Sequence, residues 1–331
     1  MTLPLQPTLL DERWGPERWQ VFNYYANQVR DAGGNPCLIW RTGGGGYSGS
    51  SWTGTSDYPG ALFDKLNLPT NQLHFDLVSI QTSQQYIDEP GTNSRPRTTR
   101  HNMWDNIWDH KRGVAAIKAW GQGVYGQTTY QIDPYRIITG GHSFGGTISG
   151  LSMITPPITY DTSFKSGSAV RRFEGQQFDS STRGLVWYSS QVDFRNRLLQ
   201  GVVQDYLSPL AIEGIFGTRT NNNGNEWGTY IPTNFKNSVS MLYYIENNLT
   251  QYYKPMFIIY QNATSFNGGT NSYPLTNNHD SRMGIDLRRA LDDKHLTYET
   301  DAVTINPGTE PTPMSSTNAA NIYDWMERLI R

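Results

Sequence analysis

Residues 136–146 read Arg-Ile-Ile-Thr-Gly-Gly-His-Ser-Phe-Gly-Gly. The first part of this stretch, Arg136–Thr139, is apolar enough to predict a buried strand, and Thr147–Met153 predicts a helix of small and apolar residues. Between them lies Gly-x-Ser-x-Gly, with Ser143 at its centre. Small neighbours allow a strand and a helix to pack closely around a strained turn, which exposes the serine oxygen beyond the strand. The stretch therefore predicts a nucleophilic serine, and the alternative is a glycine-rich turn in which Ser143 only caps the helix.

Segments on both sides alternate between strand and helix patterns. The predicted strands are Cys37–Trp40, Phe75–Thr82, Arg136–Thr139, Leu185–Ser189, Met256–Tyr260 and one within Leu296–Ile305, and the predicted helices are Arg18–Ala32, Trp104–Trp120, Thr147–Met153, Ser281–Leu291 and Thr317–Ile330. Such alternation predicts an α/β fold class, with a mostly parallel sheet and helices on both faces. We expect a single domain, 1–331, with a cap or lid at about 191–253. The cap would hold a helical pattern at Phe194–Tyr206 and the Asn/Gly-rich stretch Thr218–Gly228.

Two further stretches carry a resemblance to a known family. Residues 42–50 read Thr-Gly-Gly-Gly-Gly-Tyr-Ser-Gly-Ser, and residues 130–137 read Tyr-Gln-Ile-Asp-Pro-Tyr-Arg-Ile. With the turn at Ser143, they resemble the carboxylesterase and lipase branch of the α/β-hydrolase superfamily, which has a His-Gly-Gly-Gly loop at this position. The resemblance covers residues 36–155 clearly and 254–330 more loosely. Thr42 replaces the family's histidine, a change that leaves the backbone amides of the loop in place.

The resemblance implies an α/β-hydrolase fold with an oxyanion hole. Its backbone amides would come from Gly44, Gly45 and Phe144. Acyl transfer needs such donors, because negative charge develops on a carbonyl oxygen and rigid N–H dipoles stabilise it. The alternatives for the glycine stretch are a flexible surface loop or a phosphate-binding nest. A Walker-type loop is excluded, since no Gly-Lys-Ser/Thr follows.

The general base departs from the family pattern. The family places its histidine after the last strand, where residues 306–312 read Asn-Pro-Gly-Thr-Glu-Pro-Thr. Glu310 lies near the expected place but lacks the matched pKa of histidine. His279 falls at the correct end of the sheet, in the long segment after the fifth strand, and we predict that it is the base. The alternatives are an ordinary polar loop residue at this position and His101, which follows the second strand.

The acid partner has two candidates. Asp280 occupies roughly the family's acid position, but adjacent residues such as His279 and Asp280 seldom orient each other well. If Asp280 is the acid, His101 becomes a possible base. Asp193 follows the fourth strand, where some hydrolases carry the acid, and its alternative role is the N-cap of a helix beginning at Phe194.

Four other histidines have ordinary explanations. We expect His142 to point away from the site by the geometry of the turn, and His110 to lie on a helix. His74 and His295 precede strands, which in a parallel sheet places them at the edge opposite the active site.

Composition excludes several classes of protein. The net charge of −2 and the absence of a Lys/Arg run argue against nucleic-acid binding. Without His-x-x-x-His or Cys-x-x-Cys spacing or a dinucleotide fingerprint, we expect neither a metal nor a cofactor. Cys37 is the only cysteine, so no intramolecular disulfide can form. No apolar run approaches the ~20 residues of a membrane span. No signal peptide is visible, so the default expectation is a soluble, cytoplasmic protein.

The sequence therefore predicts a serine hydrolase, specifically a carboxylesterase. Ser143 would attack an ester carbonyl, His279 would accept its proton, and water would release the acyl-enzyme. The substrate would be a small-molecule or polymer-linked ester. The rival hypothesis is a non-catalytic protein of the same fold with a binding or structural role, for example in a virion. The missing histidine after the last strand favours the rival, while the glycine loop and the Ser143 turn favour the enzyme.

Overall fold

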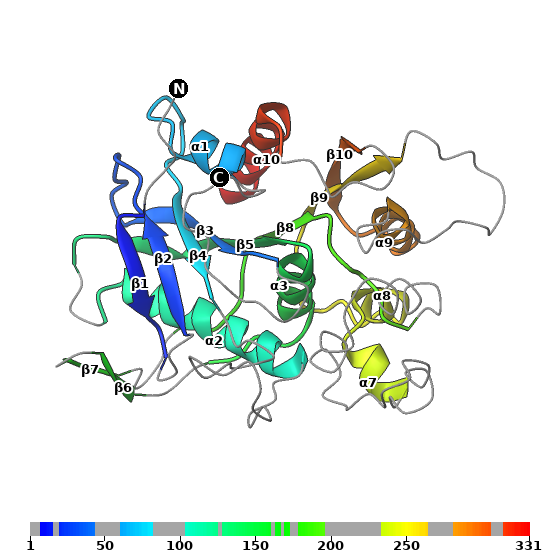
Figure 1. Ribbon diagram of the computed structural model, residues 1–331, viewed down its shortest axis with the longest axis horizontal. Coiled ribbons are helices and arrows are strands. Elements are labelled where there is room, and N and C mark those ends of the chain that lie inside the picture. Colours follow the sequence, from blue (N-terminus) through cyan, green and yellow to red (C-terminus); the bar gives the residue numbers. More distant parts are fainter. Residues whose placement is uncertain are drawn as a thin grey trace, which may run out of the picture.

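An eight-stranded sheet forms the centre of the computed structural model (Figure 1). The structure describes residues 7–15, 20–43, 60–81, 103–124, 128–159, 163–166, 169–172, 178–195, 233–263, 281–305 and 314–331. The strands are β1 (Leu9–Arg13), β2 (Val21–Tyr25), β3 (Asn35–Arg41), β4 (Asp76–Ile80), β5 (Ile132–His142), β8 (Gly184–Tyr188), β9 (Met256–Ala263) and β10 (Tyr298–Ile305). They follow the order β1-β2-β4-β3-β5-β8-β9-β10, and every pairing from β4 to β10 is parallel. β1 and β2 extend the sheet with antiparallel pairings, and β6 (Ser163–Ser166) and β7 (Ala169–Arg172) form a separate antiparallel pair.

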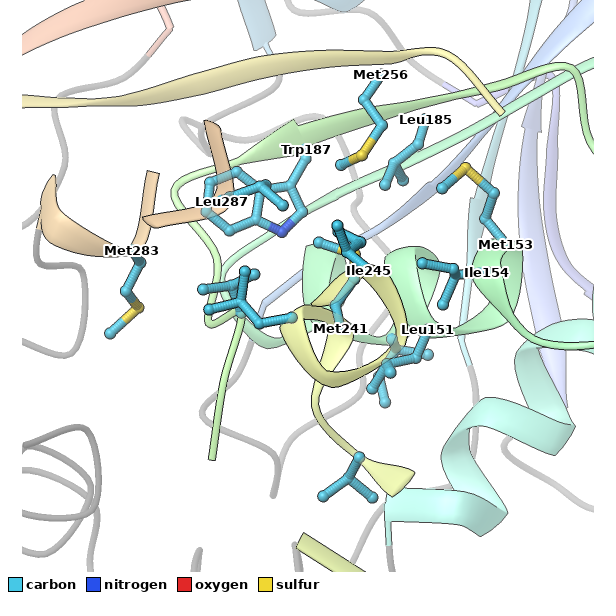
Figure 2. Close-up of a cluster of buried hydrophobic side chains, with 14 of the residues drawn as sticks. Leu151, Met153, Ile154, Leu185, Trp187, Met241, Ile245, Met256, Met283 and Leu287 are labelled. Carbon is cyan, nitrogen blue, oxygen red and sulfur yellow. The ribbon is translucent and has the colours of Figure 1, made fainter. Parts of the chain in front are cut away.

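Helices cover both faces of this sheet (Figure 1). They are α1 (Gly60–Leu66), α2 (Met103–Gly121), α3 (Phe144–Ile154), α7 (Thr233–Ser238), α8 (Met241–Glu246), α9 (Ser281–Asp293) and α10 (Ser316–Ile330). Side chains that alternate along β8 explain the layers, because successive residues of a strand point to opposite faces. Val186 and Tyr188 pack with α1 and α10, whereas Leu185 and Trp187 pack with α3, α8 and α9. Figure 2 shows Leu185, Trp187 and Met256 facing the helices of the second layer.

Most of the predicted elements are confirmed. Strands lie at all six predicted positions and helices at four of the five predicted outside the cap, and the sheet is mostly parallel. β5 is longer than predicted, since it begins at Ile132 and includes Asp133 and Pro134. The carboxylate of Asp133 accepts the amide of Tyr135 at 2.9 Å while the strand continues.

The helix predicted at Arg18–Ala32 is wrong. Its described part holds the strand β2, and residues 26–32 are not helical. Phe22 and Tyr24 pack on the α2 face of the sheet, while Tyr25 packs on the α1 face. A run of aromatic residues buried on alternate faces suits a pleated strand, and this packing outweighs the helical spacing of the sequence.

The predicted cap falls partly outside the described residues. Thr218–Gly228 is among the residues not described, and so is most of the helix predicted at Phe194–Tyr206. The first two residues of that helix, Phe194 and Arg195, are described and are not helical. α7 and α8 lie within 191–253, and α8 packs against α3 and α9.

The strand order reverses at β3, which lies between β4 and β5. In an open parallel sheet, a crevice forms at such a point beyond the carboxyl ends of the strands, and ligands bind there. The residues that follow β3 and β5 are therefore the ones placed to form a site, and they are Thr42, Gly43 and Ser143.

Candidate active site

Ser143 has a strained backbone between β5 and α3. Its φ of 55° and ψ of −130° belong to a region that side chains with a Cβ rarely adopt, at a cost of about 1–3 kcal/mol. The conformation is held from two sides. Its amide donates to the carbonyl of Tyr188 on β8 at 3.1 Å, and its carbonyl accepts the amides of Gly146 at 3.1 Å and Thr147 at 3.2 Å. The sharp turn predicted from Gly-x-Ser-x-Gly is thus present.

The glycines around Ser143 are required by close backbone contacts. A Cβ on Gly145 would overlap the carbonyl oxygen of Arg41, and one on Gly146 would overlap the hydroxyl of Ser190. A Cβ on Gly141 would lie 2.5 Å from the carbonyl carbon of Gly145. The ends of β3, β5 and β8 and the start of α3 therefore meet backbone to backbone at the serine.

The glycine loop begins directly against the serine. A Cβ on Gly43 would lie 2.9 Å from the Cβ of Ser143 and 3.1 Å from the carbonyl oxygen of His142. Gly44 and Gly45, the predicted oxyanion donors, lie outside the described residues. Phe144, the third predicted donor, is the first residue of α3, where backbone amides have no acceptor within the helix.

The ring of His142 lies beside that of Tyr188, with centroids 5.1 Å apart, and its side chain is buried. The other predicted acid–base residues, His279, Asp280 and His101, lie outside the described part of the chain, as does Glu310. The topology nevertheless fixes the edge at which α9 starts. Because β9 and β10 are parallel and α9 connects them, Ser281 lies at the carboxyl edge, the same edge as Ser143.

Asp193 lies beyond the end of β8, with its carboxylate engaged by two partners. It accepts the guanidinium of Arg195 at 2.8 and 3.0 Å and the hydroxyl of Ser240 at 2.5 Å. Arg195 also reaches Glu246 at 2.8 Å, on α8. Phe194 does not begin a helix, so Asp193 is not the N-cap considered from the sequence. This network ties the chain after β8 to α8.

A layer of buried polar groups beneath the serine turn was missed by the sequence analysis. Arg41 ends β3 with 2% exposure, and its guanidinium donates to the carbonyl of Thr42 at 2.9 Å and to Oδ1 of Asn106 at 3.2 Å. Burial lowers the pKa of Arg41 to about 10, and the charge of Asp109 offsets part of that shift. The sequence offered one indication of this layer, which is that Arg41 is a cation directly after an apolar strand and just before the glycine run.

His110 belongs to the same layer. Its Nε2 lies 3.0 Å from the hydroxyl of Thr139, on β5. Burial, together with the charges of Arg41 and Lys111, lowers the pKa of His110 to about 3. The ring is therefore neutral at physiological pH and faces the sheet, which makes it a core residue.

Among the described residues, no three His, Cys, Asp or Glu side chains gather closely enough to hold a metal ion. No described helix combines the length and apolar character needed to cross a membrane.

Comparison with solved structures identifies the fold. A truncated carbohydrate esterase from gut microbiota aligns over 99% of this chain and 98% of its own, with a TM-score of 0.61 and 13% identity. The protein has the α/β-hydrolase fold. An acetyl ester-xyloside bifunctional hydrolase from Caldicellulosiruptor lactoaceticus aligns over 99% of this chain and 95% of its own, with a TM-score of 0.56 and 13% identity. Esterase B from Lactobacillus rhamnosis covers 97% of this chain and 84% of its own, with a TM-score of 0.57 and 11% identity. No family model and no curated protein matches the sequence.

Proposed function

We propose that this α/β-hydrolase is a serine carboxylesterase with Ser143 as its nucleophile. The observation that carries the proposal is the strained backbone of Ser143 at the point where the strand order reverses. Strain of this size persists only where the surrounding structure imposes it, and it is commonly found at active sites. The strain is imposed here by the close packing at Gly141, Gly145 and Gly146. The hydrogen bond from the Ser143 amide to the Tyr188 carbonyl also imposes it.

The chemistry follows from what lies around the serine. Oγ of Ser143 attacks the ester carbonyl, a base takes the hydroxyl proton, and the base then returns it to the departing alcohol. The amides of Gly44, Gly45 and Phe144 stabilise the oxyanion. The position of Phe144 at the start of α3 supports its share of this role, because the helix dipole also favours negative charge there. Water repeats the sequence on the acyl-enzyme and releases the acid.

His279 is the proposed base. Ser281, the first residue of α9, lies at the same edge of the sheet as Ser143, and His279 is two residues away along the chain. Two residues span at most about 7 Å, a chain length that supports His279 as the base. His101 is the alternative base.

Asp280 is the proposed acid, and Asp193 is the alternative. The bonds from Arg195 and Ser240 to the Asp193 carboxylate support a structural role for that residue. Asp280 immediately precedes α9 in the sequence, and α9 begins at the edge that holds Ser143.

For the substrate, we propose a short-chain acyl ester carried on a carbohydrate. The similar structures include a carbohydrate esterase and an acetyl ester-xyloside hydrolase. The burial of Ser143, with 4% of its surface exposed, favours a small acyl group at the point of attack.

Hydrolysis of p-nitrophenyl acetate and of acetylated xylan tests the function. Ser143→Ala should abolish both activities, and His279→Ala should lower kcat by at least about 10³-fold, by analogy with other serine triads. His101→Ala is the matched control and should retain activity. Full activity in His279→Ala with loss in His101→Ala would transfer the role of base to His101.

One observation favours a non-catalytic binding or structural role instead. Residues 306–312, after β10, contain no histidine. That hypothesis predicts that the wild-type protein hydrolyses p-nitrophenyl acetate and acetylated xylan no faster than Ser143→Ala does.

A further inference from the structure

Arg41 is a fully buried cation at the most crowded point of the fold. Its carbonyl oxygen touches Gly145, and its guanidinium turns back to the carbonyl of Thr42 at 2.9 Å. Asn106, on α2, holds the other side of the guanidinium at 3.2 Å. The carbon of the guanidinium lies 6.0 Å from the centre of the Phe144 ring, at the start of α3.

Burying the charge of Arg41 costs free energy, so the hydrogen bonds of its guanidinium need an explanation. Removing a charge from water costs several kcal/mol after relaxation, and an apolar residue of similar volume often serves stability as well or better. The neighbours of Arg41 along β3, which are Leu38, Ile39 and Trp40, are apolar and fully buried. A leucine or methionine at position 41 would continue that pattern. What an apolar residue lacks is a donor for the Thr42 carbonyl.

The bond to Thr42 fixes the direction of the next peptide. In a trans peptide, the carbonyl and the following N–H point in opposite directions. The described residues contain no cis peptide bond. With its carbonyl held by Arg41, the Thr42–Gly43 peptide has one orientation, and Gly43 lies against Ser143. The plane of the Thr42–Gly43 peptide is therefore fixed where the chain leaves β3.

We infer that Arg41 is a positioning residue that fixes the Thr42–Gly43 peptide, which leads into the proposed oxyanion hole beside Ser143. The inference rests on the proposed function, since the hole is part of it. Arg41 acts through the Thr42–Gly43 peptide and does not touch the reacting atoms.

Arg41→Met and Arg41→Lys test the inference in two ways. For p-nitrophenyl acetate, Arg41→Met should lower kcat by about 10- to 100-fold, the size expected for one bond to a charged group, with KM within about threefold of wild type. Affinity for a trifluoromethyl ketone should fall in parallel with kcat, because Ser143 Oγ adds to its carbonyl carbon and the resulting hemiketal oxyanion occupies the hole. Arg41→Lys keeps the charge and can reach only one acceptor, so it should recover part of both losses.

Lys118→Met is the matched control. Lys118 is another buried cation, and it donates to a backbone carbonyl, that of Ser181, at 2.5 Å. It lies near the other end of α2, away from Ser143. Its loss removes a buried cation without touching the Thr42–Gly43 peptide, so kcat and ketone affinity should stay at the wild-type level.

Hydrogen exchange gives a readout that does not depend on activity. Amides in a peptide covering residues 42–47 should exchange about 10- to 100-fold faster in Arg41→Met than in wild type or Lys118→Met, under native conditions. Unchanged exchange, or a kcat in Arg41→Met equal to that of Lys118→Met, would overturn the inference. If the wild type hydrolyses no ester, the proposed function fails, and the exchange result alone decides whether Arg41 holds the loop.

Discussion

The carbonyl oxygen of Arg41 lies so close to the Cα of Gly145 that any side chain at position 145 would overlap it. The contact joins the end of β3 to the first turn of α3. Since both groups are backbone, neither can move aside without displacing the strand or the helix.

Gly145→Ala should therefore lower the free energy of unfolding by about 3 kcal/mol, the upper range for an overpacked core position. It should also abolish ester hydrolysis, because α3 would shift away from Ser143. Urea unfolding followed by tryptophan fluorescence measures the first effect. Gly60→Ala is the control, since a Cβ there meets nothing within 4 Å, and its stability should stay within about 0.5 kcal/mol of wild type. Equal midpoints for the two variants would contradict the packing argument.

The strain at Ser143 predicts that two inactive variants differ in stability, with Ser143→Gly more stable than Ser143→Ala. Glycine adopts the φ of 55° without a Cβ penalty, which relieves about 1–3 kcal/mol. It also gains about 0.5–1 kcal/mol of unfolded-chain entropy, which offsets part of that relief. Ser143→Gly should thus exceed Ser143→Ala in unfolding free energy by about 1 kcal/mol. A higher urea midpoint for Ser143→Ala would show that the turn stores no strain.

Asp193 and Asp280 should respond differently to replacement by asparagine. Asp193→Asn leaves Arg195 without its buried partner and loosens the bond to Ser240, so it should cost about 3 kcal/mol of stability. The kcat of the folded fraction should change by less than tenfold. Asp280→Asn should instead lower kcat by up to about 10⁴-fold with little change in stability, as expected for a triad acid. The reverse pattern would make Asp193 the acid.

His110 should make the protein sensitive to acid. Its pKa falls from 6.5 to about 3 on folding, chiefly through burial. Between these values, the unfolded chain binds a proton that the native state does not, so the free energy of unfolding decreases as the pH falls through this window. From pH 6.5 to 4.5, this group should remove about 2 kcal/mol.

His110→Asn has no titrating group and keeps a polar side chain on this face of α2. The loss of stability between pH 6.5 and 4.5 should therefore be smaller in this variant by about 2 kcal/mol, as measured by urea unfolding at the two pH values. Parallel losses in both proteins would mean that His110 titrates normally in the native state.

The strands of the sheet could be predicted because they are buried on both faces. Cys37–Trp40 and Leu185–Ser189 are continuous apolar runs, as parallel strands covered by helices require. β2 was missed for a related reason. Gln20, Val21, Tyr24 and Tyr25 also satisfy helical spacing, and only the packing of aromatic side chains against α1 and α2 selects the strand.

The nucleophile could be predicted, and its supporting residues could not. Gly-x-Ser-x-Gly encodes the turn locally. At each glycine, a Cβ would overlap atoms a few residues away or on an adjacent strand, so only glycine fits. Arg41 and Asn106 are 65 positions apart, and their contact follows from how α2 packs beneath β3. The pairing of Asp193 with Ser240 depends in the same way on α8.

Covalent labelling by a fluorophosphonate probe tests directly whether Ser143 is a nucleophile. Mass spectrometry of the wild-type protein should show one phosphonate per chain on Ser143, and Ser143→Ala should show none. Ser189→Ala is the control, because Ser189 is also a buried serine with a positive φ, 43°, beyond a neighbouring strand, and its labelling should match wild type. A folded wild-type protein that leaves Ser143 unmodified, or that reacts no faster than Ser143→Ala, would contradict the assignment of this protein as a serine esterase.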